Sequence, residues 1–350
     1  MESETNNFIK VWILTNISLC YCFYISSRIP KGILRLISLL PIFYLFIMLP
    51  FNLHSFHLGG PTTFFLVWFG IFKLLLFSFD LGPLCAPPPT LFQFISIAIL
   101  PIKIIQNPTN SENPNYPVGK TVTNMPKMSV LFAVKALLLA LVVRSYDYRQ
   151  RLHPYVILAL YFCHMYLGLE IVMPLCATPA RALFRFELEP QSNKPYLSTS
   201  LQDFWGRRWN LMVTNILRPT TYDPVLRISK RVVGLRWARF LALMSAFAVS
   251  GLMHEVIYYY LTRVSPTWEV TWFFVLHGLC VAIEVEVKKA VAERWRFHPL
   301  VSGPLTLGFL AVTANWLFFP QLLRNGVDVK AIDEYPVMVD FVKAHMPLLS

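Results

Sequence analysis

The segment 238-ARFLALMSAFAVSGLMHEVIYYYL-261 decides the fold class, because a helix of about 20 apolar residues is long enough to cross a lipid bilayer. His254 and Glu255 interrupt its apolar run, and His254 lies roughly 25 Å along the helix axis from Trp237 at a rise of about 1.5 Å per residue. An ionisable side chain inside a membrane span is costly, so it is a candidate functional residue by default. The segment therefore predicts a membrane-spanning helix that carries a functional imidazole.

His254 also lies on a stripe of small and polar residues. Ser250 and Gly251 precede it by one helical turn, and Tyr258 follows it by one turn on the same face. The small residues are expected to leave room beside the imidazole for a substrate chain, and Ser250 and Tyr258 are predicted to contact that substrate. Two other interpretations stay open, because a lone histidine in a span is often a hydrogen-bonded packing residue and Glu255 could pair with an arginine.

The composition extends this interpretation to the whole chain. Of the 350 residues, 55% are hydrophobic and 14% are charged, and the mean hydropathy is +0.51, whereas a soluble domain is about one-quarter charged. We expect an all-α, polytopic transmembrane helical bundle of about eight or nine spans, forming a single integral-membrane domain over residues 1–350. The expected spans are about 9–26, 33–50, 61–79, 128–143, 154–176, 238–261, 271–287 and 302–319.

A further apolar run, 91–105, is ambiguous. Three prolines at 87–89 precede it and Pro101 interrupts it, so a re-entrant or interfacial piece is as good an interpretation as a span. The way in which 154–176 crosses the bilayer is also left open. The segment 106-QNPTNSENPNYPVGK-120 predicts an exposed loop from its Asn, Pro and Ser residues.

The net charge of +12 is concentrated between the hydrophobic runs. Eleven Lys and Arg residues lie from Arg181 to Arg239, which predicts a cytosolic basic loop, about 181–237, resting on an anionic membrane leaflet. Membrane lipids are therefore expected partners, and a phosphate-bearing substrate would also suit the charge. The basic residues do not form the continuous face of a nucleic-acid-binding protein, so no nucleic acid partner is expected.

A polar and aromatic cluster, 204-FWGRRWN-210, lies inside that basic stretch. An interfacial helix would explain most of it, with aromatic rings at the headgroup level and arginines reaching the lipid phosphates. It would not explain Asn210, which begins the more apolar run NLMVTNIL. A carboxamide at that position suits a hydrogen bond to a carbonyl or to a catalytic group.

Other polar residues and motifs are less informative. His277, Glu284 and Lys288 follow one helix face at i, i+4 spacing, and a structural ladder explains them better than a catalytic one. The six cysteines have no zinc-type spacing with each other or with histidines, so no metal is predicted. The sequence contains no HxxxD, GxSxG, HExxH, P-loop, GxGxxG or DHHC motif.

The two polar clusters together resemble the membrane-bound O-acyltransferase (MBOAT) superfamily. The resemblance is carried by F-W-x-x-R-W-N and, about forty residues later, a membrane-embedded S-x-x-x-H-E. More narrowly, the chain looks like the plant wax synthase branch. The segments that resemble this branch include 197-LSTSLQDFWGRRWNLMVTNILR-218, 250-SGLMHEVIYYYLTR-263, 315-NWLFFPQL-322, 53-LHSFHLGGPTTFFLVW-68 and 73-KLLLFSFDLGP-83.

The resemblance implies an enzyme that transfers an acyl group from acyl-CoA to a lipid alcohol in the endoplasmic reticulum membrane. A long-chain fatty alcohol is the expected acceptor, with a wax ester and free CoA as products. It also implies that His254 is the general base and that Asn210 is its partner. Acyl-CoA is a co-substrate, and no cofactor is implied.

The remaining site residues are expected from their chemistry. Arg207 and Arg208 could bind the CoA phosphates, because a guanidinium matches phosphate geometry, or they could simply reach lipid phosphates. Trp209 completes the predicted substrate-binding set with Ser250 and Tyr258. The oligomeric state is not encoded in any motif.

Two alternative functions stay open. The same chemistry could use a sterol or a diacylglycerol as the acceptor, or acetyl-CoA as the donor, because pocket volume rather than a motif decides between them. From another class, a proton-coupled transporter could use His254, Glu255, His277 and Glu284 as a relay. A transporter favours duplicated halves, and no internal repeat is evident.

Overall fold

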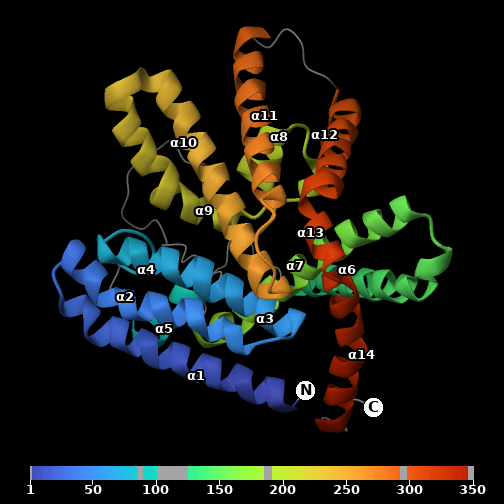
Figure 1. The fold of residues 1–350 in the computed structure, drawn as a ribbon, viewed down its shortest axis with the longest axis horizontal. Helices are drawn as coiled ribbons and strands as arrows, with labels where there is room; N and C mark the ends of the chain where they lie inside the picture. Colours follow the sequence, from blue (N-terminus) through green and yellow to red (C-terminus); the bar gives the residue numbers. More distant parts are fainter. Residues whose placement is uncertain (1, 86–89, 101–124, 185–190, 292–297, 346–350) are drawn as a thin grey trace. The chain divides into compact units, whose positions relative to one another are not determined.

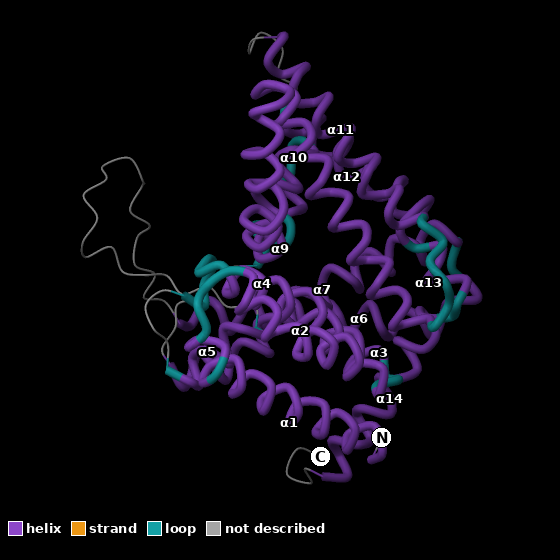
Figure 2. Tube along the Cα trace, turned by 60° about the vertical axis from the view of Figure 1, so that its left-hand side comes forward, coloured by secondary structure: helices purple, strands orange, loops and turns teal. Residues whose placement is uncertain are grey.

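The computed structural model describes residues 2–85, 90–100, 125–184, 191–291 and 298–345. Every regular element in these residues is a helix, which confirms the predicted all-α class (Figures 1 and 2). The predicted loop 106–120 lies outside the described residues. The helices are α1 (Glu2–Tyr24), α2 (Ile33–Met48), α3 (Phe56–Thr63), α4 (Ile71–Ser78), α5 (Leu91–Ile99), α6 (Met125–Ser145), α7 (Pro154–Phe184), α8 (Leu201–Asp203), α9 (Leu211–Leu217), α10 (Asp223–Thr262), α11 (Glu269–Val291), α12 (Pro299–Thr313), α13 (Pro320–Arg324) and α14 (Val327–His345).

Seven helical stretches among the described residues are long and apolar enough to cross a membrane, so the chain is a multi-pass membrane protein. They match seven of the expected spans. The remaining expected span, 128–143, does form a helix, α6, but this helix is not one of the seven stretches. The seven stretches are Glu2–Arg28, Ile33–Asn52, Phe56–Ser78, Pro154–Pro179, Leu211–Thr262, Glu269–Val291 and Pro299–Phe318.

The described part of the ambiguous run 91–105, residues 91–100, contains a short helix. Thr90 and Gln93 form a capping box that begins α5, and α5 ends at Ile99 after nine residues. Nine residues extend only about 14 Å, which is less than half of a bilayer core. Lys73 on α4 donates to the carbonyls of Ile97 (2.6 Å) and Leu100 (2.7 Å) at the end of this helix.

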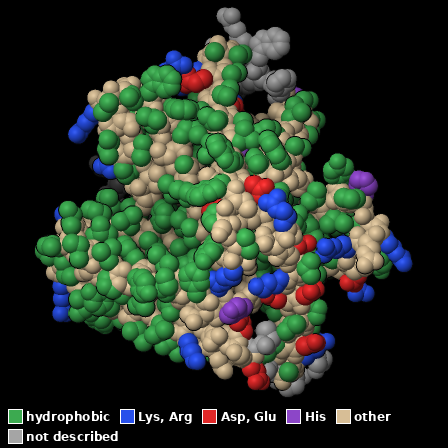
Figure 3. All heavy atoms as spheres, in the orientation of Figure 1, with side chains coloured by type: hydrophobic (Ala, Val, Ile, Leu, Met, Phe, Trp, Pro, Cys, Tyr) green, Lys and Arg blue, Asp and Glu red, His purple; other side chains and the backbone are tan. Residues whose placement is uncertain are grey.

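Apolar side chains cover the outer surface of the first helices. Figure 3 shows hydrophobic side chains gathered at the lower left, over α1, α2 and α4. On α2, Ile33 is 70% exposed, Ile37 is 55% exposed and Tyr44 is 61% exposed. Contiguous apolar surface of this kind is typical of a face that contacts lipid.

The predicted basic loop 181–237 is largely helical in its described part. It contains α8, the π-helical segment Phe204–Arg208, α9, a second π-helical segment Arg218–Tyr222 and the start of α10. Residues 223–233, expected to be part of the loop, form the first part of α10. A kink at Gly234, where φ is +76°, separates the basic start of α10 from its apolar part.

Two compact units divide the chain, and each is described by itself. The unit Ile102–Glu189 contains α6 and α7, which are joined by an ion pair between Lys135 and Glu170 at 2.5 Å. The other unit, Met1–Pro101 with Pro190–Ser350, contains the remaining helices and both predicted polar clusters.

Helices α10 and α11 lie close together because glycines face the contact. A Cβ added to Gly251 would lie 2.9 Å from the Cα of Thr271, and one added to Gly278 would lie 3.0 Å from the ring of Phe247. Small residues allow membrane helices to pack at short distance in this way. The expectation that Gly251 leaves room for a substrate is therefore wrong, because α11 fills that space.

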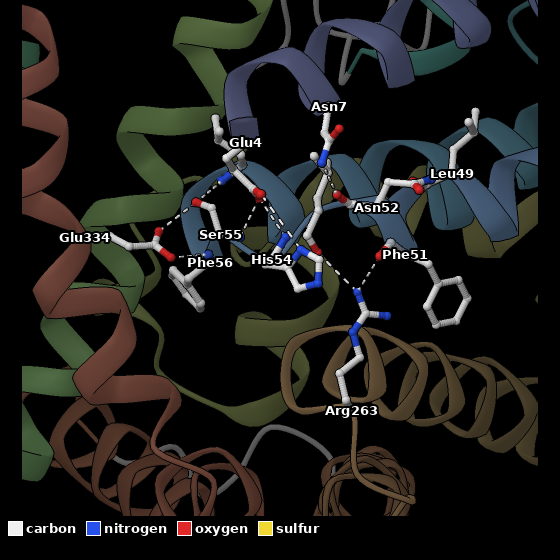
Figure 4. A network of polar contacts seen from close by, with 12 residues as sticks. Glu4, Asn7, Leu49, Phe51, Asn52, His54, Ser55, Phe56, Arg263 and Glu334 are labelled. Atoms are coloured by element: carbon white, nitrogen blue, oxygen red, sulfur yellow. Dashed lines mark hydrogen bonds and ion pairs between the residues drawn. The ribbon is translucent and has the colours of Figure 1, made fainter. Parts of the chain in front are cut away.

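A network of carboxylates joins α1, α3 and α14 (Figure 4). Glu4 accepts hydrogen bonds from the backbone N–H groups of His54 (2.6 Å) and Ser55 (2.7 Å). Glu334 accepts from the backbone of Phe56 (2.6 Å) and His57 (3.0 Å) and from the His57 ring (2.9 Å). Two acidic side chains therefore cap the N-terminus of α3, where orphan N–H groups favour negative charge.

Candidate active site around His254

The tautomer of His254 is fixed by its own helix. Its Nδ1 lies 2.7 Å from the backbone oxygen of Ser250. A carbonyl oxygen can only accept, so Nδ1 carries the proton and Nε2 keeps its lone pair. Nε2 has no hydrogen-bond partner among the residues that the structure describes. The imidazole is therefore held in the form that can accept a proton at Nε2.

Three aromatic rings from three separate elements surround the imidazole. Trp68 packs edge-on, with ring centroids 5.3 Å apart and an interplanar angle of 83°. Phe274 of α11 lies at 4.4 Å, and Phe318 lies at 5.7 Å. Trp68 and Phe318 lie on π-helical segments, Phe64–Gly70 and Ala314–Phe318. Single π turns within helices occur frequently at functional sites.

The cluster 204–210 is anchored to α11. The indole N–H of Trp205 donates to Nδ1 of His277 at 3.0 Å, and Nε2 of His277 lies 2.9 Å from the hydroxyl of Thr313. Trp205 also packs on Phe274, with ring centroids 5.6 Å apart. Phe274 contacts the His254 ring as well, so one phenyl ring joins the two clusters that the sequence analysis singled out.

Asn210 begins helix α9. Its φ is +41°, a left-handed conformation that asparagine tolerates better than most residues, and its side-chain oxygen accepts from the N–H of Val213 at 3.4 Å. The side chains of Asn210 and His254 form no hydrogen bond with each other in the structure. The local sequence thus explains this asparagine as a helix cap, while its amide N–H₂ group is not used by the cap.

The two adjacent arginines have different surroundings. Arg208 donates to the carboxylate of Asp203 at 2.5 Å and to the backbone oxygens of Asn193 (3.4 Å) and Lys194 (3.3 Å). Arg207 is exposed and has no ion-pair or hydrogen-bond partner within the described part of the chain. Arg208 therefore stabilises its own segment, and the guanidinium of Arg207 is available to bind an anion.

Ser250 and Tyr258 act on the surroundings of His254 through backbone carbonyls, and the printed ring contact of Trp209 is with Phe204. Ser250 is buried, and its carbonyl orients the imidazole. The hydroxyl of Tyr258 donates to the carbonyl of Phe318 at 2.8 Å, which fixes the segment that places Phe318 against His254. Trp209 stacks on Phe204, with ring centroids 5.4 Å apart and planes 13° apart.

The neighbouring acidic residues do not connect into a relay. Glu255 accepts from the backbone and hydroxyl of Thr271, both at 3.3 Å, rather than from an arginine. Glu284 pairs with Lys288 at 2.6 Å, as the ladder interpretation expects. No hydrogen bond links His254, Glu255, His277 and Glu284 to one another, although all four are described. Within the described ranges, no group of three or more His, Cys, Asp or Glu residues is placed to hold a metal ion.

Sequence reasoning missed Trp68 as a neighbour of His254. It lies in 64-FFLVWFG-70, an aromatic run with no polar residue to distinguish it from any lipid-facing helix. The contact joins positions far apart in sequence, so only tertiary structure reveals it. Phe318 was part of the matching segment 315–322, but it had no assigned role.

Known proteins share the sequence of almost the whole chain. The sequence profile of the membrane bound O-acyl transferase family matches residues 188–276, a range that includes both Asn210 and His254. Long-chain-alcohol O-fatty-acyltransferase of Simmondsia chinensis is 52% identical over 98% of this chain and 97% of its own length. Acyl-CoA–sterol O-acyltransferase 1 of Arabidopsis thaliana is 45% identical over 96% of each chain. Probable long-chain-alcohol O-fatty-acyltransferase 3 of the same plant is 47% identical over 100% of this chain and 99% of its own length. The chain belongs to the membrane bound O-acyl transferase family, and it is an acyltransferase.

Proposed function

We propose that this protein transfers a fatty acyl group from acyl-CoA to the hydroxyl of a long-chain alcohol, with a wax ester and free CoA as products. The observation that carries the proposal is the state of His254: an imidazole with Nδ1–H donated to its own helix, a bare Nε2, and aromatic walls. The names of two of the relatives given above, both long-chain-alcohol acyltransferases, support the choice of acceptor.

The mechanism follows from the bare Nε2. An alcohol is a poor nucleophile, so Nε2 of His254 accepts the hydroxyl proton as the oxygen attacks the thioester carbon. The tetrahedral intermediate collapses, the C–S bond breaks, and the CoA sulfur takes the proton back from the imidazolium. General-base assistance of this kind contributes roughly 10² to 10⁴-fold in rate. The three aromatic rings around the imidazole, together with the bound substrates, would limit the access of water, which otherwise competes with the alcohol and hydrolyses acyl-CoA.

Transfer occurs directly, without an acyl-enzyme. An acyl-enzyme needs a serine or cysteine nucleophile beside a base. The hydrogen bond that the structure gives to the His254 ring goes to a backbone carbonyl, and no serine hydroxyl or cysteine thiol among the described residues is bonded to it. A direct attack needs only the alcohol, the thioester and the base.

The other predicted site residues take supporting roles in this proposal. The amide N–H₂ of Asn210 orients a substrate oxygen, Arg207 binds a phosphate of CoA, and Arg208 holds the segment that carries both. Trp209 and Tyr258 fix the surrounding segments through Phe204 and Phe318. The basic stretch that includes Arg207 is expected to face the cytosol, where acyl-CoA is available, from the endoplasmic reticulum membrane.

A sterol acceptor is the second candidate, and the 45% identical sterol acyltransferase is the observation that favours it. Expression in a yeast that lacks neutral-lipid synthesis, with added fatty alcohol and labelled acyl-CoA, separates the two. We expect labelled wax esters, and we expect none from an equally expressed His254→Ala protein. Sterol esters without wax esters would reassign the acceptor, and proton-driven uptake without any esterification would reassign the protein to a transporter.

A further inference from the structure

Trp68 presents a hydrogen-bond donor that has no partner. Its side chain is 1% exposed, and its indole N–H has no acceptor among the described residues. Buried indole N–H groups usually find a partner, as Trp205 does on His277. A buried donor without a partner destabilises the folded protein, so such a donor is uncommon outside functional sites.

The position of Trp68 supplies one. Its ring packs edge-on against His254, and it lies within the π-helical segment Phe64–Gly70. The rest of that segment is apolar: Phe64 packs on Trp68, with ring centroids 5.4 Å apart, and the segment contains no hydroxyl or carboxylate side chain. The ring that carries the unused donor therefore packs against His254, and it lies in an apolar segment.

The chemistry of the bound reactants decides what the donor can meet. The indole N–H needs an acceptor oxygen, and two substrate oxygens lie close to Nε2 of His254 during the reaction. The alcohol oxygen must direct its proton to Nε2 and a lone pair to the thioester carbon. The thioester carbonyl oxygen, in contrast, gains negative charge as the bond forms, and it requires donors aimed at it.

The other donors around the imidazole are already engaged. The Nδ1–H of His254 is donated to the carbonyl of Ser250, and the hydroxyl of Tyr258 is donated to the carbonyl of Phe318. Phe274 and Phe318, the other two ring neighbours of His254, have no polar side-chain atom. Trp68 is thus the ring neighbour that brings an unused donor to His254.

We propose that the indole N–H of Trp68 donates to the carbonyl oxygen of the acyl-CoA thioester and stabilises the oxyanion that forms there. This inference rests on the proposed function. It makes Trp68 a catalytic residue in addition to His254, and it gives the buried indole N–H an acceptor that the described residues do not supply. The amide of Asn210 is then a second donor or an orienting group, and not the sole source of oxyanion stabilisation.

The chain offers a matched control. The indole N–H of Trp12 on α1 is also buried without a partner, but its ring contact is with Phe8 and not with His254. If an unpaired indole N–H were only tolerated in this protein, both tryptophans would respond alike to its removal. The proposal requires that they differ.

The experiment replaces each tryptophan with β-(3-benzothienyl)alanine, which keeps the bicyclic shape and exchanges the N–H for sulfur, and separately with phenylalanine. Initial rates of wax ester formation are measured with purified protein, normalised to the amount of protein. At position 68 we expect kcat to fall by about 10²–10³-fold with both replacements, the range for loss of one oxyanion donor, while KM for acyl-CoA changes little. At position 12 we expect kcat within twofold of the unmodified protein.

Two outcomes would overturn the inference. The first is a benzothienyl protein at position 68 that keeps its kcat, because the ring would then matter only through its shape. The second is an equal loss at positions 12 and 68. In either case, ester formation by the unmodified protein and its loss in His254→Ala would leave the proposed function standing, whereas an unmodified protein that forms no ester would remove the proposed function itself.

Discussion

Replacing His277 is predicted to detach the 204–210 cluster from α11. His277 is completely buried and accepts the indole N–H of Trp205 at 3.0 Å. His277→Ala leaves that N–H without an acceptor, at a cost of roughly 1–3 kcal/mol, and it opens a cavity. The hydroxyl of Thr313 keeps its hydrogen bond to the carbonyl of Phe309, so the substitution leaves no second unpaired polar group there. The expected total is about 2–5 kcal/mol.

Thermal unfolding in detergent measures this cost. At about 2–4 °C per kcal/mol for a domain of 150–250 residues, we expect the Tm of His277→Ala to fall by several degrees. His277→Gln can still offer an acceptor to Trp205, so its Tm should fall by less. Because Trp205 shares Phe274 with His254, kcat should fall in the same order. A Tm of His277→Ala within 1 °C of wild type, with unchanged kcat, would refute the reasoning.

Three further predictions concern packing, substrate charge and pH. Gly251→Ala should lower Tm and kcat, because the added Cβ would lie 2.9 Å from the α11 backbone. Gly168→Ala, whose Cβ would meet nothing within 4 Å, should change neither quantity. Equal melting curves for the two variants would contradict the close packing of α10 and α11. Arg207→Gln should raise KM for acyl-CoA with little change in Tm, whereas Arg208→Gln should lower Tm. An unchanged KM for acyl-CoA in Arg207→Gln would show that Arg207 does not bind this substrate. Burial raises the pKa of Glu334, but hydrogen bonds from His57, Phe56 and Ser55 outweigh it and lower the pKa from 4.5 to about 2. Folding therefore stabilises the ionised carboxylate, and Glu334→Gln should lower the unfolding free energy by up to ~3 kcal/mol at pH 7. The difference in unfolding free energy between this variant and the wild type should shrink as pH falls from 4.5 toward 2. A difference that stays constant over this range would contradict the role of Glu334 as a cap of α3.

Much of the fold could be predicted from the sequence, because a membrane-spanning helix is recognisable as one long apolar run. Hydropathy alone located seven of the helical stretches. It could not show that α10 begins at Asp223, because charged residues are compatible with both a loop and an exposed helix. It also could not resolve 91–105, where apolar composition is the same for a span and for the short α5.

The site was predictable in part. The cost of burying an imidazole singled out His254, and the unexplained Asn210 drew attention to the cluster 204–210. His254 and Trp205 both contact Phe274, which depends on how α10 and the segment Phe204–Arg208 pack against α11, and no local pattern encodes that packing. Trp68 was not predictable for the same reason. The small residues beside His254 led to the wrong expectation of space for a substrate, because a glycine accommodates a neighbouring helix as readily as a substrate.

The kcat of His254→Ala for wax ester formation, measured on protein whose Tm matches wild type, tests the central claim most directly. If Nε2 takes the proton of the attacking alcohol, kcat falls by about 10²-fold or more, toward the 10⁴-fold upper range of general-base assistance. A folded His254→Ala protein that esterifies fatty alcohol at the wild-type rate would contradict the role of this imidazole.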